Sequence, residues 1–377
     1  MDKKFRVLHF VPYFPPHSWG LEMYTKEWAE NYVKSKGECM VITFSGGQNE
    51  WNRSENGYQV ISLPAFDIVH SFPFPMIWLP SFWRGLRQIN KWNPDIIHTH
   101  TRFFLSSFLG GLFARWCHIP WIHIEHGSGF VVSGNKVVEY MSRWYDQTLG
   151  RWTLSHADWV VTVSKACEVF VRDTFHIQKI STIYRWMDLI LSNKKPSKKE
   201  IHIGYVGRLV DLKWVDVLIE GFFLFQKKYK GTIPLKLKIV GDGPERRNLE
   251  EFVKMHELDN KVEFLGQRSI HEVRSDILPS FHIFVNPSFQ EWFPTTVIEA
   301  LVSGCHVIAT NVGGTKEIQN KIPFSLIEPR SIWSIADALE NNIAYLDIDK
   351  DPIKPLSVFS WKETFIEFWK VYMKISW

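Results

Sequence analysis

The sequence alternates short apolar segments with longer amphipathic segments, and this alternation occurs twice along its 377 residues. The apolar segments have the length of buried strands and end in glycine, proline or polar residues, whereas the amphipathic segments have the length of helices. This pattern predicts parallel sheets with helices on both faces. The predicted strands span 5–11, 39–44, 95–101, 121–127 and 159–164 in the first half, and 201–209, 235–243, 262–266, 281–288 and 306–314 in the second.

The length of the chain and one short break indicate two domains. A chain of 377 residues exceeds the size of one ordinary hydrophobic core. The segment 194–200, KKPSKKE, interrupts the alternation with charge and proline and is interpreted as a linker. We therefore expect two doubly wound α/β domains, 1–193 and 201–359, that face each other across a cleft. Such sheets bind ligands at the carboxyl ends of their strands.

The composition narrows the class of ligand and the compartment. A formal net charge of +4 does not call for nucleic acid, but it permits an anionic substrate or an anionic membrane surface. Four cysteines without a CxxC pair argue against a zinc site and a disulfide framework. They fit a reducing cytoplasm. No apolar run reaches the roughly 18–20 residues of a membrane-spanning helix. We expect a cytoplasmic protein, either soluble or peripheral on the inner face of the cytoplasmic membrane.

Basic residues and glycines follow the predicted strands of the second half. Arg208 and Lys213 lie between the first of these strands and a helix. There a planar guanidinium and an ammonium suit a diphosphate, and a solvated loop is the alternative. Gly241 begins a Gly-Asp-Gly-Pro turn, which either lets the backbone approach a ligand or is an ordinary turn. Gly266 ends a third strand, where main-chain groups are available for a flat base.

Two glutamates stand eight positions apart in the segment 289–305, FQEWFPTTVIEALVSGC. A helix that begins after Pro294 presents the free N–H groups of Thr295, Thr296 and Val297 to an anion. Glu299 then lies about one turn into the helix, where a carboxylate can accept hydrogen bonds from the vicinal hydroxyls of a ribose. Glu291 precedes the helix and can reach a second polyol or a developing positive charge. One anion and two polyols describe a nucleotide sugar; a capping acid and an exposed helix glutamate are the alternative.

Histidines end two predicted strands of the first half. His98 and His100 close one strand, and Glu125-His126-Gly127 closes the next. A histidine at a strand end can orient a sugar hydroxyl or handle its proton, and a buried structural role is the alternative, favoured for His98. His98 and His100 share a face of their strand, but no third metal ligand accompanies them, so we expect no metal. The acidic segment 346–351, LDIDKD, is interpreted as a surface loop.

These segments together resemble glycosyltransferase family 4, the retaining nucleotide-sugar transferases of the GT-B fold. Their order along the chain and the eight-residue spacing of the two glutamates carry the resemblance. The matching segments are 94–100, 125–129, 157–164, 207–222, 239–244, 262–267, 282–288 and 291–318, with 359–372 similar to a terminal helix that crosses back to the first domain. The resemblance implies that residues 360–377 belong with the N-terminal, acceptor-binding domain and that 201–359 binds the nucleotide sugar.

The resemblance also implies roles for individual residues. Arg208 and Lys213 would bind the donor diphosphate, Glu299 the ribose and Glu291 the transferred sugar. His100 or His126 would lie at the acceptor side of that sugar, and Gly20 would approach the donor phosphates and the acceptor. The donor would be a UDP- or GDP-sugar used as substrate, with no cofactor and no metal. Electrostatic stabilisation of the departing diphosphate would supply most of the catalysis.

The chain departs from the family at four turns, where tryptophan stands in place of an expected glycine. These residues are Trp19, Trp186, Trp214 and Trp292. Glycine at such turns supplies positive φ or a bare backbone against a ligand, and a strained non-glycine residue costs about 1–3 kcal/mol. Three readings remain open: shifted loops, rings that stack on the ligand, or reduced activity.

The aromatic and basic segments 70–92 and 101–116 bear on the acceptor. They combine tryptophan and phenylalanine with arginine and lysine, which suits contact with a membrane surface, although packing within the first domain is the alternative. We expect a glycan or polyprenyl-linked acceptor and a role in cell-surface polysaccharide synthesis. Two other readings stay open: a non-catalytic or impaired nucleotide-sugar-binding protein, and an epimerase or phosphorylase of the same fold.

Overall fold

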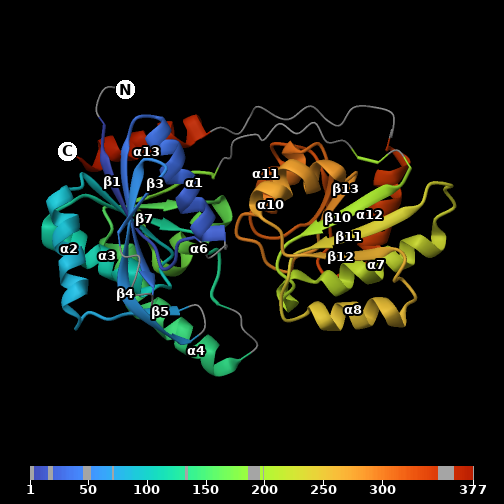
Figure 1. Cartoon of the computed structure of the whole chain (residues 1–377), viewed down its shortest axis with the longest axis horizontal. Helices are drawn as coiled ribbons and strands as arrows, with labels where there is room; N and C mark the ends of the chain where they lie inside the picture. Colours follow the sequence, from blue (N-terminus) through green and yellow to red (C-terminus); the bar gives the residue numbers. More distant parts are fainter. Residues whose placement is uncertain are drawn as a thin grey trace. The chain divides into compact units, whose positions relative to one another are not determined.

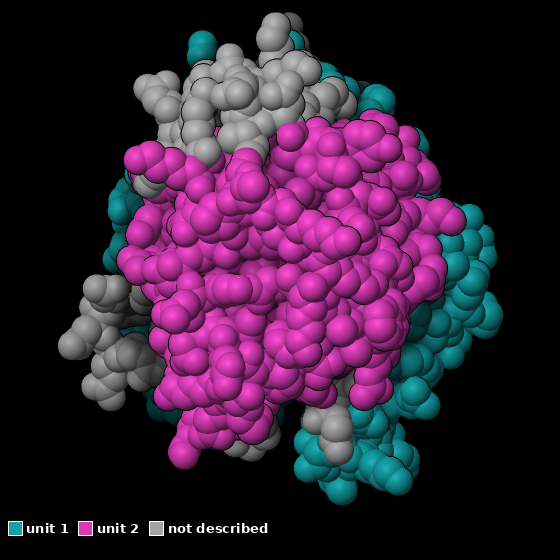
Figure 2. Space-filling model, turned by 90° about the vertical axis from the view of Figure 1, so that its right-hand side faces the viewer, with its two compact units in different colours: residues 1–187, 360–377 teal, residues 188–359 magenta. Residues whose placement is uncertain are grey.

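The computed structural model describes residues 4–15, 20–45, 52–69, 72–131, 135–185, 196–197, 199–346 and 361–376. The chain divides into two compact units, coloured separately in Figure 2. Unit 1 comprises Met1–Met187 and Ser360–Trp377, and unit 2 comprises Asp188–Phe359. Both units are α/β with parallel central sheets, which confirms the predicted fold class.

The sheet of unit 1 has the order β3-β4-β2-β1-β6-β7-β8-β9, with β5 paired to β4. The strands β4, β2, β1, β6, β7, β8 and β9, in this spatial order, pair in parallel. Strands β3 and β5 run antiparallel to β4. The strands are β1 (Arg6–Phe10), β2 (Glu38–Ser45), β3 (Arg53–Glu55), β4 (Tyr58–Val69), β5 (Phe72–Pro75), β6 (Ile96–His100), β7 (Trp121–Glu125), β8 (Trp159–Thr162) and β9 (Ile180–Thr182).

The helices of unit 1 cover both faces of this sheet. They are α1 (Gly20–Lys34), α2 (Pro80–Trp92), α3 (Leu105–Cys117), α4 (Lys136–Tyr145), a π-helical turn (Asp146–Gly150), α5 (Arg151–His156), α6 (Lys165–Phe175) and α13 (Trp361–Ile375). The terminal helix α13 lies beside β1 and α1 (Figure 1). Its Tyr372 contacts the ring of Phe5 at 5.4 Å between centroids, so the last helix of the chain completes the first unit.

The sheet of unit 2 is entirely parallel and has the order β12-β11-β10-β13-β14-β15. The strands are β10 (Ile201–Val206), β11 (Leu235–Val240), β12 (Val262–Gly266), β13 (Ile283–Asn286), β14 (His306–Thr310) and β15 (Ser325–Ile327). Strands β11 and β12 lie on one side of β10, and β13, β14 and β15 lie on its other side. The strand order therefore reverses between β10 and β13, which is where doubly wound sheets bind ligands.

Figure 1 shows α7 and α8 on one face of this sheet and α10 and α11 on the other. Apolar residues of β10, β11 and α7 form the core between the sheet and the first pair of helices. The helical segments are a 3₁₀ turn (Asp211–Lys213), α7 (Val215–Lys228), α8 (Arg246–Met255), α9 (Ile270–Glu272), a π-helical turn (Val273–Ile277), a 3₁₀ turn (Leu278–Ser280), α10 (Thr295–Val302), α11 (Thr315–Gln319) and α12 (Ile332–Ala344).

Each predicted strand overlaps an observed one, but most observed strands end earlier. The strand predicted over 201–209 ends at Val206, and the strand predicted over 281–288 spans only Ile283–Asn286. The residues beyond these ends form the loops that carry the candidate site. Five observed strands, β3, β4, β5, β9 and β15, lie where no strand was predicted. Among the described helices, none is long and apolar enough to cross a membrane.

Candidate functional site

Two loops meet at the switch point of the unit 2 sheet, one after β10 and one after β13. The backbone N–H of Phe289 donates a hydrogen bond to the carbonyl of Leu212 at 2.9 Å. The rings of Trp214 and Phe289 lie 4.9 Å apart. An ion pair between Lys213 and Glu291 makes a third link. The basic loop and the acidic loop predicted from the sequence are therefore neighbours in the fold.

Glu291 is held in place by several contacts. Its Oε1 lies 2.6 Å from Lys213 Nζ and accepts a hydrogen bond of 3.2 Å from Asn286 Nδ2 at the end of β13. Its backbone carbonyl lies so close to Gly313, in the loop after β14, that a Cβ added there would overlap it. The sequence assigned Lys213 to a diphosphate and Glu291 to a sugar. The structure shows the two side chains joined in the ligand-free chain.

Glu299 lies on α10, and its side chain is buried with only 3% of its surface exposed. Its Oε1 accepts two hydrogen bonds from Arg274, from Nε at 3.0 Å and from an Nη at 2.7 Å. Its Oε2 is buried and has no hydrogen-bond partner in the described part of the chain. Leaving a buried acceptor without a partner costs about 1–3 kcal/mol, a cost that a donor placed against this oxygen would remove.

Arg274 is a site residue that sequence reasoning missed. It belongs to the π-helical turn between α9 and β13, 25 residues before its carboxylate partner. A π-helical turn inserts an extra residue into the helical repeat and often marks a functional position. The turn itself is not visible in the amino-acid pattern.

Helix α10 begins at Thr295, as predicted, and Pro294 is its N-cap. Proline offers no side-chain acceptor, and this cap makes no side-chain hydrogen bond to the first turn. Thr295 and Thr296 are half-buried. Val297 is buried, and its N–H donates to the Pro294 carbonyl at 3.2 Å, so the prediction of a free N–H at Val297 is wrong. The positive end of the helix dipole therefore begins directly after the loop that carries Glu291.

The other predicted donor residues lie at the carboxyl ends of β10, β11 and β12. Gly241 has φ of +133°, and a Cβ there would overlap the carbonyl of Gly207. The N–H of Gly241 donates to the carbonyl of Gly266 at 2.9 Å, and Gly266 itself has φ of +70°. Arg208 is exposed, and its carbonyl accepts a hydrogen bond from the hydroxyl of Tyr205 at 3.0 Å. These glycines let three strand ends lie against one another.

The tryptophans that replace the family's glycines behave differently from one another. Trp214 has φ of +45° and ψ of +45°, the left-handed conformation that a glycine would adopt without strain. Trp292 is not among the described residues with positive φ, and 44% of its surface is exposed. Trp19 and Trp186 lie outside the described residues, as do residues 347–351 of the acidic segment.

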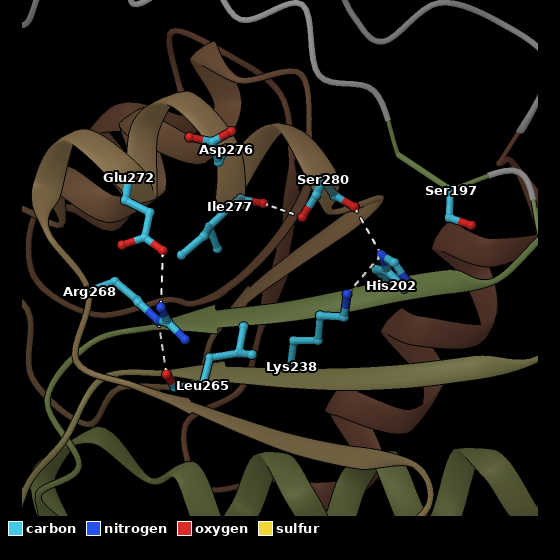
Figure 3. Close-up of a pocket in the computed structure, with 9 residues that line it drawn as sticks. All are labelled: Ser197, His202, Lys238, Leu265, Arg268, Glu272, Asp276, Ile277 and Ser280. Atoms are coloured by element: carbon cyan, nitrogen blue, oxygen red, sulfur yellow. Dashed lines mark hydrogen bonds and ion pairs between the residues drawn. The ribbon is translucent and has the colours of Figure 1, made fainter.

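A cavity of about 390 Å³ in unit 2 is lined in part by the π-helical turn that carries Arg274 and by the end of β12 (Figure 3). Figure 3 shows Lys238 and His202 on adjacent strands, with Arg268 and Glu272 paired at the opposite side. Its lining residues are Ser197, His202, Lys238, Leu265, Arg268, Glu272, Asp276, Ile277 and Ser280, none of which was predicted as a site residue. Both signs of charge line this cavity, and no atom of its lining side chains is among the buried atoms without a hydrogen-bond partner in the described residues, unlike Glu299 Oε2. We therefore place the candidate site at the strand ends.

Four histidines of unit 1, His9, His98, His100 and His126, form a cluster near the carboxyl ends of β1, β6 and β7. His100 is fully buried, and its two ring nitrogens face His9 at 2.9 Å and His126 at 3.2 Å. His126 is half-buried. Of the two histidines predicted for the acceptor side, His126 is therefore the more exposed, and His100 lies behind it. His98 is buried and contacts the hydroxyl of Tyr372 at 3.1 Å, in keeping with a structural role.

A buried ionic cluster supports the same strand end. The side chain of Arg102 lies 3.1 Å from Glu125 and 3.2 Å from Asp146. Burial alone would raise the pKa of Glu125, but Arg102, His123 and the Gly127 N–H together hold it well below its usual range. Burial raises the pKa of Asp146 to about 6, despite the opposing effect of Arg102. The charged Glu125 accepts the N–H of Gly127 at 2.8 Å and so shapes the loop that carries His126.

Gly20 is the first residue of α1. Its carbonyl accepts a hydrogen bond from the buried Arg185 at 3.3 Å, and Arg185 also pairs with Glu27 at 3.0 Å. No atom lies within 4 Å of a Cβ built at Gly20, so packing among the described residues does not demand glycine there. Among the described residues, no group of three histidine, cysteine, aspartate or glutamate side chains is arranged to hold a metal ion.

Comparison with known proteins gives a consistent result for both units. Residues 20–190 match the family model described as Glycosyltransferase Family 4, and residues 200–344 match that described as Glycosyl transferases group 1. An uncharacterized glycosyltransferase of Methanocaldococcus jannaschii, MJ1069, is 28% identical, with 99% of each chain covered. The phosphatidylinositol N-acetylglucosaminyltransferase gpi3 subunit of Schizosaccharomyces pombe is 27% identical over 89% of this chain and 72% of that protein.

Solved structures share the fold of the whole chain. Anabaena Alr3699/HepE in complex with UDP has a TM-score of 0.69 and 18% identity, with 92% of this chain and 91% of that one covered. The likeness at this identity concerns the fold, in which two doubly wound units follow one another along one chain.

Proposed function

The chain belongs to glycosyltransferase family 4, with the GT-B fold, and from this premise we propose its substrates and chemistry. The protein moves a sugar from a UDP- or GDP-sugar to a glycan or polyprenyl-linked acceptor, with retention of the anomeric configuration. It does so without a metal or a cofactor and acts in cell-surface polysaccharide synthesis. The UDP in the HepE structure and the N-acetylglucosaminyltransferase activity named for gpi3 support a nucleotide-sugar donor.

The observation that carries this proposal is the environment of Glu299. Arg274 holds one carboxylate oxygen and orients the group, while the other oxygen is buried and unsatisfied in the described part of the chain. A ribose offers two adjacent hydroxyl donors, and a carboxylate oxygen accepts from them. Binding of the nucleotide would thus remove an existing desolvation cost.

The diphosphate would bind beside the N-terminus of α10. Arg208, Lys213 and the first N–H groups of α10 are donors that suit phosphate oxygens. Because Lys213 is paired with Glu291 at 2.6 Å, its ammonium already has a defined position before the ligand arrives. These positive groups would stabilise the charge that develops on the departing diphosphate, which would accept the proton of the acceptor hydroxyl.

Glu291 would contact the transferred sugar and stabilise positive charge at its anomeric carbon. Its position is defined by Lys213, Asn286 and the close approach of Gly313, so a small displacement would be resisted by three separate elements. Such positioning contributes to catalysis when the reacting groups are held in a near-attack arrangement. His126 of unit 1 would contact a hydroxyl of the sugar or the acceptor.

The acceptor would be reached at a membrane surface through α2 and α3. Neither helix contains an aspartate or glutamate, and their basic residues are Arg84, Arg87, Lys91 and Arg115. Trp78, Trp83, Leu112 and Trp116 are exposed along and beside these helices, and an apolar groove of about 200 Å³ lies between them. Exposed indole rings together with lysine and arginine favour the interface of an anionic bilayer. The protein would then be peripheral on the cytoplasmic side.

Two assays on the purified chain test this proposal. The first is a thermal-shift screen with UDP-, GDP- and ADP-sugars, in which a rise of the unfolding midpoint identifies both base and sugar. The second measures release of nucleoside diphosphate with and without acceptor lipids or glycans. Transfer requires release that depends on the acceptor. Binding without release across a broad acceptor panel would instead support a non-catalytic binder.

A further inference from the structure

Three histidines of unit 1 form a linear chain of ring contacts that starts in the core and ends at the half-buried His126. His9 Nδ1 lies 2.9 Å from His100 Nε2, and His100 Nδ1 lies 3.2 Å from His126 Nε2. The rings of His100 and His126 are stacked, with centroids 5.5 Å apart. Each link joins one nitrogen to one nitrogen and therefore contains one proton.

Burial keeps these three rings neutral. It lowers the pKa of His9 and of His100 well below the ordinary value, and it lowers the pKa of His126 to about 3. A neutral imidazole carries one N–H, so one of its nitrogens donates and the other accepts. The protonation of one ring therefore fixes that of the next, and only two arrangements satisfy both links.

In the first arrangement every ring carries its proton on Nδ1. His9 donates to His100, His100 donates to His126, and the Nδ1–H of His126 remains available to a ligand. In the second arrangement every ring carries its proton on Nε2, and the direction of both links is reversed. His126 then offers Nδ1 as an acceptor.

His9, the buried end of the row of histidines, distinguishes the two proton arrangements. His9 Nε2 is buried and has no hydrogen-bond partner in the part of the chain that the structure describes. The second arrangement would place an N–H there without an acceptor, whereas the first leaves a bare nitrogen. Buried N–H groups without a partner are rarer than under-satisfied acceptors. The environment of His9 therefore favours the first arrangement.

The side chains around the three histidines do not compete for the nitrogens that join them. Trp28 of α1 lies over His9 at 4.4 Å between centroids, and Tyr24 meets His126 edge-on at 5.0 Å. His98 contacts the His9 ring at 4.7 Å, but its own Nε2 is engaged with Tyr372. The charged or titratable groups that act on His126 are Glu125, Arg185 and His123.

We propose that His9 is a positioning residue which, through His100, fixes His126 as the Nδ1–H tautomer, so that His126 donates a hydrogen bond to a substrate oxygen. The donation to substrate rests on the proposed sugar transfer, whereas the tautomer is a property of the free protein. Neither His9 nor His100 contacts substrate in this scheme, because both are fully buried.

Nitrogen-15 NMR of histidine-labelled, ligand-free protein at pH 7.5 measures the tautomer directly. The expected spectrum assigns the proton of His126 to Nδ1 and none to Nε2. His9→Leu removes the first donor and should give His126 a mixture of both tautomers. Tyr372→Phe is the matched control. It removes the hydrogen-bond partner of the neighbouring His98 and leaves the contacts among His9, His100 and His126 in place.

An Nε2–H form of His126 in the native protein would overturn the proposal, and so would a His126 spectrum that is identical in native protein and His9→Leu. If His9→Leu fails to fold, the native spectrum still decides. Where transferase activity is found, His9→Leu should lower kcat about tenfold, the effect of one lost hydrogen bond, with little change in the KM for donor. Absence of activity in the native protein would contradict the proposed function but leave the tautomer measurement valid.

Discussion

Lys213 Nζ lies 2.6 Å from Glu291 Oε1, across the two loops that follow β10 and β13. These loops are 78 residues apart in sequence and meet because the strand order of the sheet reverses between their strands. The pair places a cation assigned to the donor diphosphate beside a carboxylate assigned to the transferred sugar. Lys213 and Glu291 therefore fix each other's position, although Lys213 is proposed to bind the donor and Glu291 to act in the transfer step.

The two glutamates should separate when binding and transfer are measured independently. Glu299→Ala removes the buried oxygen that awaits the ribose, and we expect it to weaken donor affinity. Glu291→Ala removes the group beside the anomeric carbon, and we expect it mainly to slow transfer. Calorimetric titration of the donor and single-turnover kinetics check the two effects. Equal losses of affinity in both variants would contradict these assignments.

Arg274 should be required for stability as well as for donor binding. Arg274→Met leaves the buried Glu299 carboxylate without its cation, and breaking a buried pair in this way costs about 3–5 kcal/mol. Because the double variant Arg274→Met/Glu299→Leu removes both charges, it should recover a large part of that loss. Urea unfolding of the two variants gives the comparison. If the double variant is no more stable than Arg274→Met, the pair is not coupled as the 2.7 Å contact implies.

Trp214 should reveal the cost of its backbone conformation when two small residues replace it. Trp214→Gly and Trp214→Ala both remove the ring that contacts Phe289. At φ of +45°, alanine keeps the steric penalty and glycine does not. We therefore expect the glycine variant to be more stable than the alanine variant by about 1 kcal/mol. Urea unfolding measures this difference, and equal stability would show that the loop relaxes away from the left-handed conformation.

The buried histidines should make unit 1 sensitive to acid. Burial lowers the pKa of His9, His98, His100 and His126 in the folded state. Because their unfolded pKa is about 6.5, the stability that they contribute is present above pH 6.5. It is lost as the pH falls below that value, by up to about 1.4 kcal/mol per histidine and pH unit.

Hydrogen exchange of peptides that contain β6, measured in urea between pH 7 and pH 5, follows this loss. The variant His98→Phe retains a ring in the same packing and removes one titrating group. Its stability should depend less steeply on pH, by about one proton. An unchanged slope would mean that His98 is protonated in the folded state.

The fold was predictable because buried parallel strands appear as continuous apolar segments, as at β10 and β14. Five strands were missed. The edge strands β3, β9 and β15 have only three residues each, and β4 and β5 include Pro64, Pro73 and Pro75, which argue against central strands. At the candidate site, Lys213 could be proposed because it lies in the turn after a strand, and Glu299 because it lies one turn into a helix that starts after a strand-end loop.

Arg274 and His9 could not be found in this way, for two physical reasons. The pairing of Arg274 with Glu299 depends on a π-helical turn, which sequence periodicity does not indicate. His9 lies within β1 and is paired in register with His98, which requires knowing that β1 and β6 are neighbours. The order of strands in a sheet, unlike their existence, is not contained in the local pattern.

The central claim is that Glu299 forms part of a nucleotide-sugar site in unit 2. Thermal unfolding of the native protein and of Glu299→Ala, each with and without UDP- and GDP-sugars, tests it most directly. A ligand at 100 times its Kd stabilises a protein by about 2.7 kcal/mol. We predict that at least one of these donors raises the midpoint of the native protein and has a much smaller effect on Glu299→Ala. No shift of the native protein with any donor, or an equal shift in both proteins, would contradict the claim.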